Sequence, residues 1–424
     1  MGNLDYTQVL NKIENTRRFG NEPGVVVTAQ VIKVLREKGK QKRIIPYIHV
    51  AGTNGKGSVC AFFSSILKKE HMRVGTFVSP HLVDFEERIT VDGRMIPKED
   101  VTRLGNYLLD IDFGIGLTMF DYCLAMALLY FEEQQCDYMV IETGLGGRLD
   151  STNAIGTPQC AVITKIGYDH MAILGSDIAD IAAEKAGIIK ENSAVVVEQQ
   201  DKRAMQVIEQ EAQKKHARII TVEQSDIARC SGYALRLCGT FQWENAAAAE
   251  LAARYVLGKR YSGPEYEMQY DKTGSKSEKT DLNDRIKSAL EEAVWPGRME
   301  IVSKAPFLLV DGAHNSNGVD ALKESLMQMY PGEKFCFFMG VMADKDYDVM
   351  IREILPLAEE FYTVTPDSDR ALQASHLADF IRKEGVEATE LSGVDEIRKH
   401  LKRDTKNVAF GSLYFIGELK QHRI

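Results

Sequence analysis

Apolar residues in this chain form short runs that alternate with longer stretches of helical spacing. The first run, at residues 44–50, is followed by a Gly-rich turn and an apolar-periodic stretch over 59–67. This alternation predicts parallel strands joined by covering helices. Further strands are expected at 74–78, 138–142, 161–166 and 194–197. The first part of the chain therefore predicts an α/β fold with a mainly parallel sheet.

A second alternating set follows Trp295-Pro296-Gly297-Arg298, where Pro and Gly interrupt regular structure. Strands are expected at 307–311, 335–340, 361–364 and 408–411, with helices near 318–329, 346–358, 371–383 and 393–402. This pattern is typical of a small doubly wound α/β domain. We therefore expect a first domain over residues 1–297 and a second over 298–424. The polar stretch 259–284 is interpreted as an exposed insertion or mobile loop without chemistry.

Composition narrows the class of protein. The 424 residues suit two domains, and 44% hydrophobic with 27% charged residues is typical of globular proteins. A net charge of -9 argues against a general nucleic-acid binder. Seven cysteines without a C-x-x-C pair favour a reducing compartment. The N-terminus has no apolar signal region, and no run reaches the roughly 18 apolar residues of a membrane helix. We expect a cytoplasmic protein.

The most specific local feature is the Gly-rich turn Ala51-Gly52-Thr53-Asn54-Gly55-Lys56-Gly57-Ser58. Glycines let backbone N–H groups face an anion, and the start of a helix adds partial positive charge. Lys56 supplies a full charge for the β- and γ-phosphates of ATP, and the Ser58 hydroxyl suits Mg²⁺. Gly57 stands between Lys and Ser, unlike the usual phosphate loop. A Gly-rich turn that binds nothing is the less favoured alternative.

Polar side chains are also expected where two later strands end. Glu142 closes the strand at 138–142, and His170 follows the strand at 161–166. Because the carboxyl ends of parallel strands border the ligand crevice, we expect Ser58, Glu142 and His170 at one edge. Taken alone, a Glu at a strand end is more often solvated, and imidazole is an unusual ligand for Mg²⁺. From its spacing alone, Lys185 is interpreted as a surface lysine on an Ala-rich helix.

These residues belong to a series of motifs that covers nearly the whole chain. The motifs are AGTNGKGS (51–58), SPHL (79–82), ERI (87–89), ETGLGGRLD (142–150), DH (169–170), EKAGI (184–188), PGR (296–298), DGAHN (311–315), DKD (344–346) and GSLY (411–414). Their order resembles that of folylpolyglutamate synthases and dihydrofolate synthases, of the Mur ligase superfamily. The resemblance implies an N-terminal P-loop-type ATPase domain and a Rossmann-like C-terminal domain.

The resemblance implies a reaction in which ATP phosphorylates a carboxylate and the amine of L-glutamate displaces phosphate from the acyl phosphate. The acceptor would be tetrahydrofolate, dihydropteroate or both. Positioning, together with charge neutralisation by lysine and magnesium, would carry most of the catalysis. No nucleic acid or membrane partner is implied, and family members are commonly monomeric.

The same motifs imply roles for individual residues. The loop Gly52, Thr53, Asn54, Gly55, Lys56, Gly57 and Ser58 would bind ATP phosphates. Asn245 would lie near adenine, Asp311 near ribose, and Arg298 and His314 near the ATP phosphates or the acyl phosphate. Two Mg²⁺ sites are implied, with a monovalent cation as a further expectation; their ligands would be Ser58, Ser79, Glu142, His170 and a carbamate on Lys185. The implied catalytic set is Lys56, Glu142, His170, Lys185 and His314.

The folate side is implied by loop segments of the family. Its expected residues are Pro80, His81, Phe85, Arg88, Phe120, Asp121, Arg148 and Asp150. Two positions depart from the family pattern: Asp121 stands where Glu is frequent, and Phe241 where His or Tyr is frequent. Both departures bear on folate specificity, because neither removes a phosphate or metal ligand.

Two other hypotheses remain open at the level of the sequence. One is another Mur-type ligase that acts on a cell-wall nucleotide precursor or a poly-amino-acid; no additional N-terminal domain for a uridine nucleotide is apparent. The other is a non-catalytic nucleotide-binding protein on the same scaffold. The complete set Lys56, Ser58, Glu142, His170, Lys185 and His314 argues against it, and acceptor-dependent ADP release would exclude it.

Overall fold

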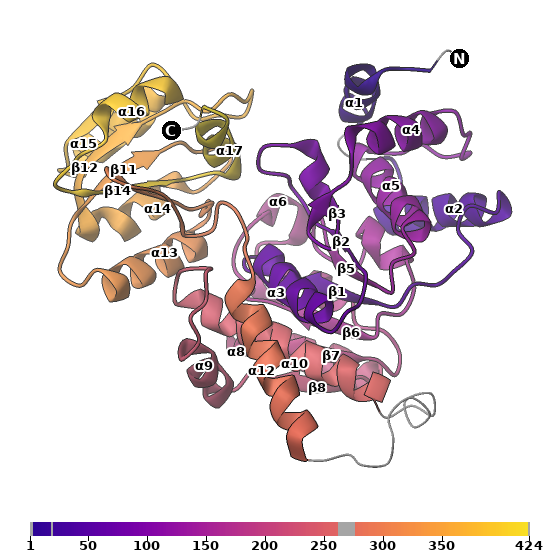
Figure 1. The fold of residues 1–424 in the computed structure, drawn as a ribbon. Coiled ribbons are helices and arrows are strands. Elements are labelled where there is room, and N and C mark those ends of the chain that lie inside the picture. The colour runs from indigo at the N-terminus through magenta and orange to yellow at the C-terminus, as the bar shows by residue number, and fades with distance from the viewer. Residues whose placement is uncertain (1–2, 18–19, 262–275, 423–424) are drawn as a thin grey trace. The chain divides into compact units, whose positions relative to one another are not determined.

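The computed structural model describes residues 3–17, 20–261 and 276–422, which fall into two compact units (Figure 1). The first unit comprises residues 1–81, 85–234 and 244–293, and the second comprises 82–84, 235–243 and 294–424. Each unit contains a mainly parallel sheet with covering helices. The expected α/β class is therefore confirmed, whereas the exact domain boundary at residue 297 stays a prediction.

An eight-stranded sheet forms the centre of the first unit as described, in the order β4-β3-β2-β5-β1-β6-β7-β8. Its strands are β1 Tyr47–Ala51, β2 Val74–Phe77, β3 Ile89–Val91, β4 Arg94–Met95, β5 Tyr138–Glu142, β6 Cys160–Ile163, β7 Ala194–Val197 and β8 Arg218–Thr221. Along this sheet order, the neighbours from β2 through β5, β1, β6 and β7 to β8 pair parallel. The pairs β2–β3 and β3–β4 are antiparallel. The central β1 pairs with β5 and β6, so residues after these three strands meet at one edge.

Helices cover this sheet and bury their apolar residues. The helices are α1 Tyr6–Glu14, α2 Gly24–Glu37, α3 Lys56–Lys69, α4 Lys98–Leu109, α5 Met119–Glu133, α6 Met171–Leu174, α7 Ile178–Ala186, α8 Lys202–Lys214, α9 Gln224–Ser231, α10 Phe241–Tyr261 and α12 Lys276–Glu292; short 3₁₀ turns are η1 Phe85–Arg88 and η2 Ser151–Ala154. The buried residues lie on one side in α1 and α8 and all round in α5. Helix α3 packs on β1, β2 and β5 and is covered in turn by α12. Helices α1, α2, α4 and α5 share one core cluster, and α7 and α8 share another with β6 and β7.

The second unit contains a six-stranded sheet in the order β13-β12-β11-β14-β10-β9. Its elements are β9 Glu300–Lys304, β10 Phe307–Val310, α13 Ser316–Met329, β11 Phe335–Met339, α14 Tyr347–Ile354, η3 Leu355–Leu357, β12 Ala358–Thr363, α15 Ala374–Lys383, β13 Ala388–Glu390, η4 Val394–Glu396, α16 Ile397–His400, β14 Lys406–Phe410 and α17 Leu413–Gln421. Only β9 of these strands pairs antiparallel. One core cluster includes α13, α14 and α15, and another includes α16 and α17. The sheet is thus covered on both faces.

Two expectations about local structure were wrong. The strand expected at 161–166 ends at Ile163, and the residues after it form a loop. The polar stretch 259–284 is not a loop at its ends, because α10 continues to Tyr261 and α12 begins at Lys276. The middle of that stretch, 262–275, lies outside the described residues. Within the part that the structure describes, no helix is long and apolar enough to cross a membrane.

Candidate functional site

The phosphate loop depends on two glycines that no other residue can replace without strain. Gly52 has φ +157°, and a Cβ there would lie 1.8 Å from Thr164 Oγ1. Gly55 has φ +89° in the left-handed region, and a Cβ there would lie 2.3 Å from Asn245 Oδ1. Gly55 also precedes the first residue of α3, so the loop leads directly into the start of that helix. Such a helix start provides the backbone N–H groups that bind anions.

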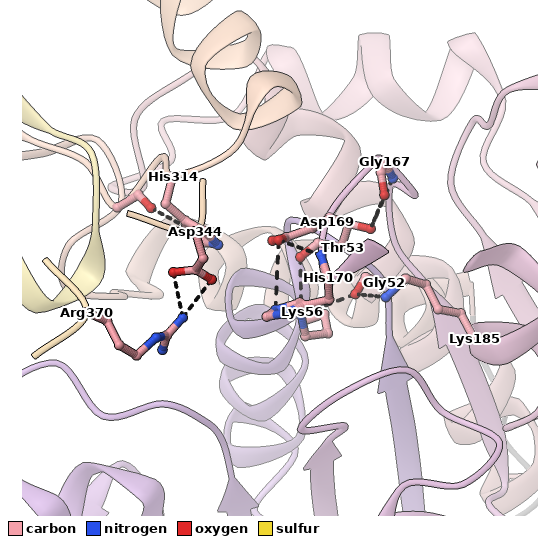
Figure 2. Close-up of polar contacts among 11 residues, drawn as sticks. Gly52, Thr53, Lys56, Gly167, Asp169, His170, Lys185, His314, Asp344 and Arg370 are labelled. Carbon is pink, nitrogen blue, oxygen red and sulfur yellow. Dashed lines mark hydrogen bonds and ion pairs between the residues drawn. The ribbon is translucent and has the colours of Figure 1, made fainter. Parts of the chain in front are cut away.

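The segment after β6 holds the loop in place. The Thr53 and Asn54 N–H groups donate to Lys165 O at 2.9 and 3.3 Å. Thr164 Oγ1 donates to Asn54 O at 2.6 Å, and Thr53 Oγ1 donates to Gly167 O at 3.0 Å (Figure 2). The Thr164 hydroxyl and the carbonyl groups of Lys165 and Gly167 therefore support the loop, and β6 does not continue through these residues.

Lys56 lies beside the carboxylate that was predicted to accompany it. Its Nζ donates to Gly52 O and Thr53 O, each at 3.2 Å (Figure 2). It also lies 3.9 Å from Glu142 Oε1. Glu142 is buried at the end of β5, and its Oε2 accepts from the Ser79 N–H at 3.3 Å. The structure thus brings Lys56, Glu142 and Ser79 together. Ser58 is buried in the first turn of α3.

Lys185 is not the surface residue that its spacing alone indicated. It is only 4% exposed on α7, and its Nζ donates to Gly52 O at 2.8 Å (Figure 2). Burial, together with the nearby Lys56 cation, lowers the pKa of the Lys185 ammonium to about 7. A large fraction of Lys185 is therefore a neutral amine at pH 7, and a neutral amine is the form that reacts with CO₂.

His170 lies farther from its strand than predicted. Strand β6 ends at Ile163, so His170 belongs to the following loop, where it adopts φ +53° just before α6. Its Nε2 lies 3.9 Å from Asp169 Oδ1 (Figure 2). Of the three side chains expected at one edge of the sheet, Glu142 ends a strand, Ser58 lies in a helix and His170 lies in a loop. The expected position of His170 directly after a strand is therefore wrong.

Asn245 connects α10 to the phosphate loop. It is buried, and its Oδ1 lies against Gly55 closely enough to exclude a side chain there. The preceding residue, Glu244, accepts from the Gln199 N–H at 2.6 Å. The beginning of α10 is thus fixed against both the loop and the residues that follow β7.

Asp121 and Phe120 lie at the start of α5. Asp121 is buried, and its Oδ2 completes the N-terminal cap by accepting from Thr118 N at 2.9 Å and Thr118 Oγ1 at 2.7 Å. Its Oδ1 accepts from Ser151 Oγ at 2.6 Å and Thr28 Oγ1 at 3.3 Å. Asp121 thereby joins α2, α5 and η2. Phe120 packs edge-on against Phe77, with ring centroids 5.4 Å apart.

Asp150 and Arg148, from the same motif, have different surroundings. Asp150 is buried and accepts from Gly144 N at 3.0 Å, Leu145 N at 2.9 Å and Thr152 N at 3.0 Å, and also from Thr152 Oγ1. Burial raises the pKa of the Asp150 carboxyl, against the effect of these donors. Arg148 is exposed and pairs with Glu184.

The SPHL and ERI motifs meet through their side chains. Arg88 is buried and its Nε donates to His81 Nδ1 at 2.8 Å. Because Nδ1 accepts, the proton of a neutral His81 lies on Nε2. Phe85 belongs to the core cluster of α5, and Pro80 is exposed.

The second unit holds its three predicted residues around one turn. Asp311 is buried, and its two oxygens accept from Met299 N and Ala313 N, each at 2.8 Å. His314 Nδ1 donates to Gly312 O at 2.8 Å, and a Cβ on Gly312 would lie 2.4 Å from Arg298 Nη1. In the DKD motif, Asp344 accepts a two-oxygen ion pair from Arg370 at 2.7 and 2.8 Å (Figure 2).

The oxygen donors of the first unit fit Mg²⁺ in kind but are not a preformed cluster. Among the described residues, no group of three His, Cys, Asp or Glu side chains could hold a metal. The carboxylate of Glu142 and the hydroxyl of Ser58 suit Mg²⁺. A charged Lys185 would repel it, so this donor set fits a metal better when Lys185 is neutral or carries a carbamate.

The sequence interpretation gave no role to several residues that organise the site. His49 Nε2 lies 2.7 Å from Thr152 Oγ1, and both residues are buried. Ser151 and Thr28 bind Asp121, and Asp169 lies beside His170. A histidine within an otherwise apolar strand is the one signal that could have identified part of this network.

Family models match both halves of the chain. The Mur ligase middle domain matches residues 50–231, and the Mur ligase glutamate ligase domain matches residues 297–410. A dihydrofolate synthase/folylpolyglutamate synthase of Bacillus subtilis is 33% identical, with 98% of each chain covered. A folylpolyglutamate synthase of Lacticaseibacillus casei is 30% identical, with 87% of each chain covered.

Solved structures agree with these matches. A Mycobacterium tuberculosis folylpolyglutamate synthase complexed with ADP has a TM-score of 0.83 and 26% identity, covering 99% of this chain and 98% of that one. E. coli FolC in complex with DHPP and ADP has a TM-score of 0.80 and 26% identity, covering 99% and 97%. The resemblance inferred from the motifs is thereby confirmed, and this chain belongs to the folylpolyglutamate synthase and dihydrofolate synthase family of Mur ligases.

Proposed function

We propose that this protein is an ATP-dependent, ADP-forming ligase that joins L-glutamate to a folate. The observation that carries the proposal is the first-unit loop, where Lys56 lies 3.9 Å from Glu142 and Lys185 donates to Gly52. This loop joins a parallel strand to the start of a helix, as a triphosphate site requires. Membership of a family of folate ligases supports the choice of substrates.

The proposed reaction has two steps, phosphorylation of the folate carboxylate and then amide formation. A carboxylate oxygen of the folate attacks the γ-phosphorus of ATP, the bond to the β-phosphate oxygen breaks, and ADP leaves. The free amine of glutamate then attacks the acyl carbon and phosphate leaves, with one proton released as the amide forms. The chain contributes mainly by positioning and by stabilising charge, because the phosphoryl step needs little covalent help.

Roles in the first unit follow from these positions. The backbone of residues 52–58 would bind the phosphates, and Lys56 would lie on their β- and γ-oxygens. Mg²⁺ would be held by Ser58 and Glu142, with Ser79, His170 and a carbamate on Lys185 as further ligands, and it would neutralise charge on the transferring phosphoryl group. Asn245 would border adenine, since it lies against Gly55.

The carbamate on Lys185 is a separate proposal. The neutral Nζ would attack CO₂, form a C–N bond and release one proton, which converts a cation into an anionic oxygen ligand. The buried position and lowered pKa of Lys185 support this reaction. Native mass spectrometry in bicarbonate should show about 44 Da of added mass, which is the mass of CO₂. The Lys185→Arg variant should not show this addition. An active, metal-bound protein with unmodified Lys185 would refute the carbamate alone.

In the second unit, Arg298 and His314 are proposed to contact phosphates and Asp311 the ribose. Both Asp311 oxygens already accept backbone N–H groups. An Asp311 contact with ribose would therefore use the remaining lone pairs of the carboxylate. Arg298 and His314 both lie close to Gly312 and carry N–H donors, which makes them the stronger candidates for anion contact.

The deciding experiment is ADP release by the purified protein with Mg-ATP and L-glutamate. Dihydropteroate and tetrahydrofolate are supplied separately. Release with both acceptors would establish a bifunctional synthase, and release with tetrahydrofolate alone a dedicated polyglutamylating enzyme. Release only with a cell-wall precursor would replace folate by another Mur-type acceptor. ATP binding without release with any acceptor would refute a ligase.

Oligomeric state and compartment are lesser parts of the proposal. We propose a cytoplasmic monomer, consistent with the free cysteines, six of which are buried. Size-exclusion chromatography with light scattering at working concentrations should give a mass near the 47.5 kDa of one chain. A mass of twice that value would refute the monomer.

A further inference from the structure

His49 is a buried histidine to which the proposed reaction gives no role. It lies in the middle of β1, three residues before Gly52, and is 0% exposed. Burial lowers the pKa of its imidazole to about 3, and Lys190 adds a smaller effect in the same direction. The ring is therefore neutral at pH 7. An uncharged, inaccessible imidazole cannot act on substrate directly, so any contribution passes through its neighbours.

The hydrogen bonds of His49 have a defined direction. Its Nε2 lies 2.7 Å from Thr152 Oγ1, and the Thr152 hydroxyl donates to Asp150 Oδ1. A hydroxyl has only one proton to donate, so the Thr152 oxygen accepts from His49 Nε2–H. His49 Nδ1 is then a bare acceptor, in agreement with its having no partner among the described residues. In the hydrogen-bond chain His49–Thr152–Asp150, each group therefore donates to the next one, and the direction cannot be reversed.

This chain ends on the loop after Glu142. Asp150 Oδ2 accepts from the N–H groups of Gly144 and Leu145, at 3.0 and 2.9 Å. A Cβ on Gly144 would lie 2.7 Å from the Phe120 ring, so this part of the loop packs directly on Phe120. A change in the position of Gly144 would therefore move the surface offered to the acceptor.

The neighbours of Thr152 extend the same network. Ser151 Oγ donates to Asp121 Oδ1 at 2.6 Å, which connects η2 to α5. Asn153 Nδ2 donates to Gly187 O at 3.1 Å, next to the end of α7. The short turn η2 therefore has side-chain connections to β1, α5 and the end of α7 at once.

We propose that His49 is a positioning residue for the folate acceptor. Through Thr152 and Asp150 it fixes the loop 143–150 against Phe120, and so determines how well the acceptor is held. This inference rests on the proposed function, since it names which substrate the network serves. The effect should fall on acceptor binding and not on ATP binding, because the phosphate loop has its own support in residues 164–167.

The test uses Thr152→Val, which removes the hydroxyl at nearly constant volume, and Thr152→Ser, which keeps it. Tetrahydrofolate and Mg-ATP are varied separately in the ADP-release assay with full-length protein. Thr152→Val loses both the bond from His49 and the bond to Asp150. We expect it to raise the KM for tetrahydrofolate about tenfold while the KM for ATP stays within about twofold. Thr152→Ser should stay near the wild-type values.

His49 itself provides a second pair. His49→Leu removes only the bond to Thr152, so it should raise the KM for tetrahydrofolate in the same direction as Thr152→Val but by less. His49→Gln, whose side-chain N–H can replace Nε2–H, should recover most of the lost affinity. The matched control is Thr76→Val. Thr76 is buried in β2 of the same unit, and its hydroxyl bonds Ser64 Oγ at 2.8 Å. The Thr76→Val variant therefore loses a buried hydroxyl bond outside the His49–Thr152–Asp150 network. Its KM for tetrahydrofolate should not change.

The outcomes are distinguishable. Unchanged KM values in Thr152→Val, or a parallel rise for ATP, would overturn the positioning role, because a general loosening of β1 affects the phosphate loop as well. An equal rise in Thr76→Val would also overturn it. Wild-type protein that releases no ADP with any folate would instead refute the proposed function.

Discussion

The phosphate loop and the loop after Glu142 belong to neighbouring strands, yet they hold their charged groups in opposite ways. Lys56 and the buried amine of Lys185 donate to backbone carbonyls of the phosphate loop, and Lys56 adds only a long ion pair of 3.9 Å with Glu142. Asp150 in the loop after Glu142, and Asp121 on α5, which binds Ser151 directly after that loop, instead accept from four protein donors each. The lysines can therefore exchange carbonyls for phosphate at small cost, whereas the carboxylates would lose strong bonds.

This contrast separates binding groups from framework groups within the same set of motifs. A charge that is held by carbonyls is ready for a ligand. A buried carboxylate with four donors stabilises the loop that carries it. Substitutions on the two sides should thus affect different quantities: turnover on the phosphate side, and stability together with the KM for folate on the other side.

The largest expected effect is on turnover, from Lys56→Ala. Loss of a charge that stabilises the transferring phosphoryl group should lower kcat on the order of a thousandfold, with the melting temperature little changed. The control is Lys69→Ala, in the last turn of the same helix, where Lys69 pairs with Glu292 at 2.7 Å. Near-normal turnover in Lys56→Ala would mean that the phosphate loop does not hold a ligand-binding charge, and the contrast with the loop after Glu142 would fail.

Asp150→Asn should act mainly on stability. The amide can accept only at one atom, so at least one of the donors at Gly144, Leu145 and Thr152 loses its partner. We expect a decrease of about 2 kcal/mol in the free energy of unfolding, measured in urea. The matched variant Glu184→Gln changes a carboxylate that pairs with the exposed Arg148 and should change stability little. A higher KM for folate at unchanged stability would instead make Asp150 a binding group.

Glu198 is a buried carboxyl group whose charge is poorly compensated, and its effect on stability can be tested by changing pH. Burial and the nearby Glu244 carboxylate raise the pKa of the Glu198 carboxyl well above its usual value of 4.5. The folded state then keeps a proton that the unfolded state has lost, so stability decreases as pH rises above about 4.5. Glu198→Gln removes that dependence and should stabilise the protein by about 1 kcal/mol or more at pH 8. Equal unfolding curves at pH 5 and pH 8 for both proteins would contradict it.

Arg148→Ala should have the smallest effect on stability. Arg148 is 62% exposed in its side chain and pairs only with Glu184 among the contacts described. Exposed ion pairs contribute little, so we expect a change below about 0.5 kcal/mol. A clear rise in the KM for folate at unchanged stability would place Arg148 with the lysines as a binding group, and no kinetic change would leave it outside both groups.

Much of the fold followed from the sequence, for reasons visible in particular elements. The strands at 138–142 and 194–197 were predicted with the observed bounds, because short apolar runs fill both faces of a buried strand. Residues 164–166 were predicted as part of a strand, but the Thr164 hydroxyl and the Lys165 carbonyl bind the phosphate loop instead. The three-residue strands β3 and β13 are too short to give a periodic signal.

The site was predictable where a motif defines its own backbone. The loop 52–58 is local, so its glycines, Lys56 and the start of α3 could be read directly. The partners of Asp121 come from Thr28 and Ser151, which lie 93 and 30 residues away. The burial of Lys185 depends likewise on its contact with Gly52, 133 residues distant. Such contacts arise from tertiary packing, and spacing along the chain does not encode them.

The turn η2 also constrains how this protein can change during evolution. Its residues Ser151, Thr152 and Asn153 bond to different elements because a 3₁₀ turn rotates by about 120° per residue. A substitution there alters one connection and leaves the others in place. An inserted or deleted residue rotates every following side chain toward the wrong element. The length of this segment should therefore be preserved among relatives more strictly than the identity of any one of its residues.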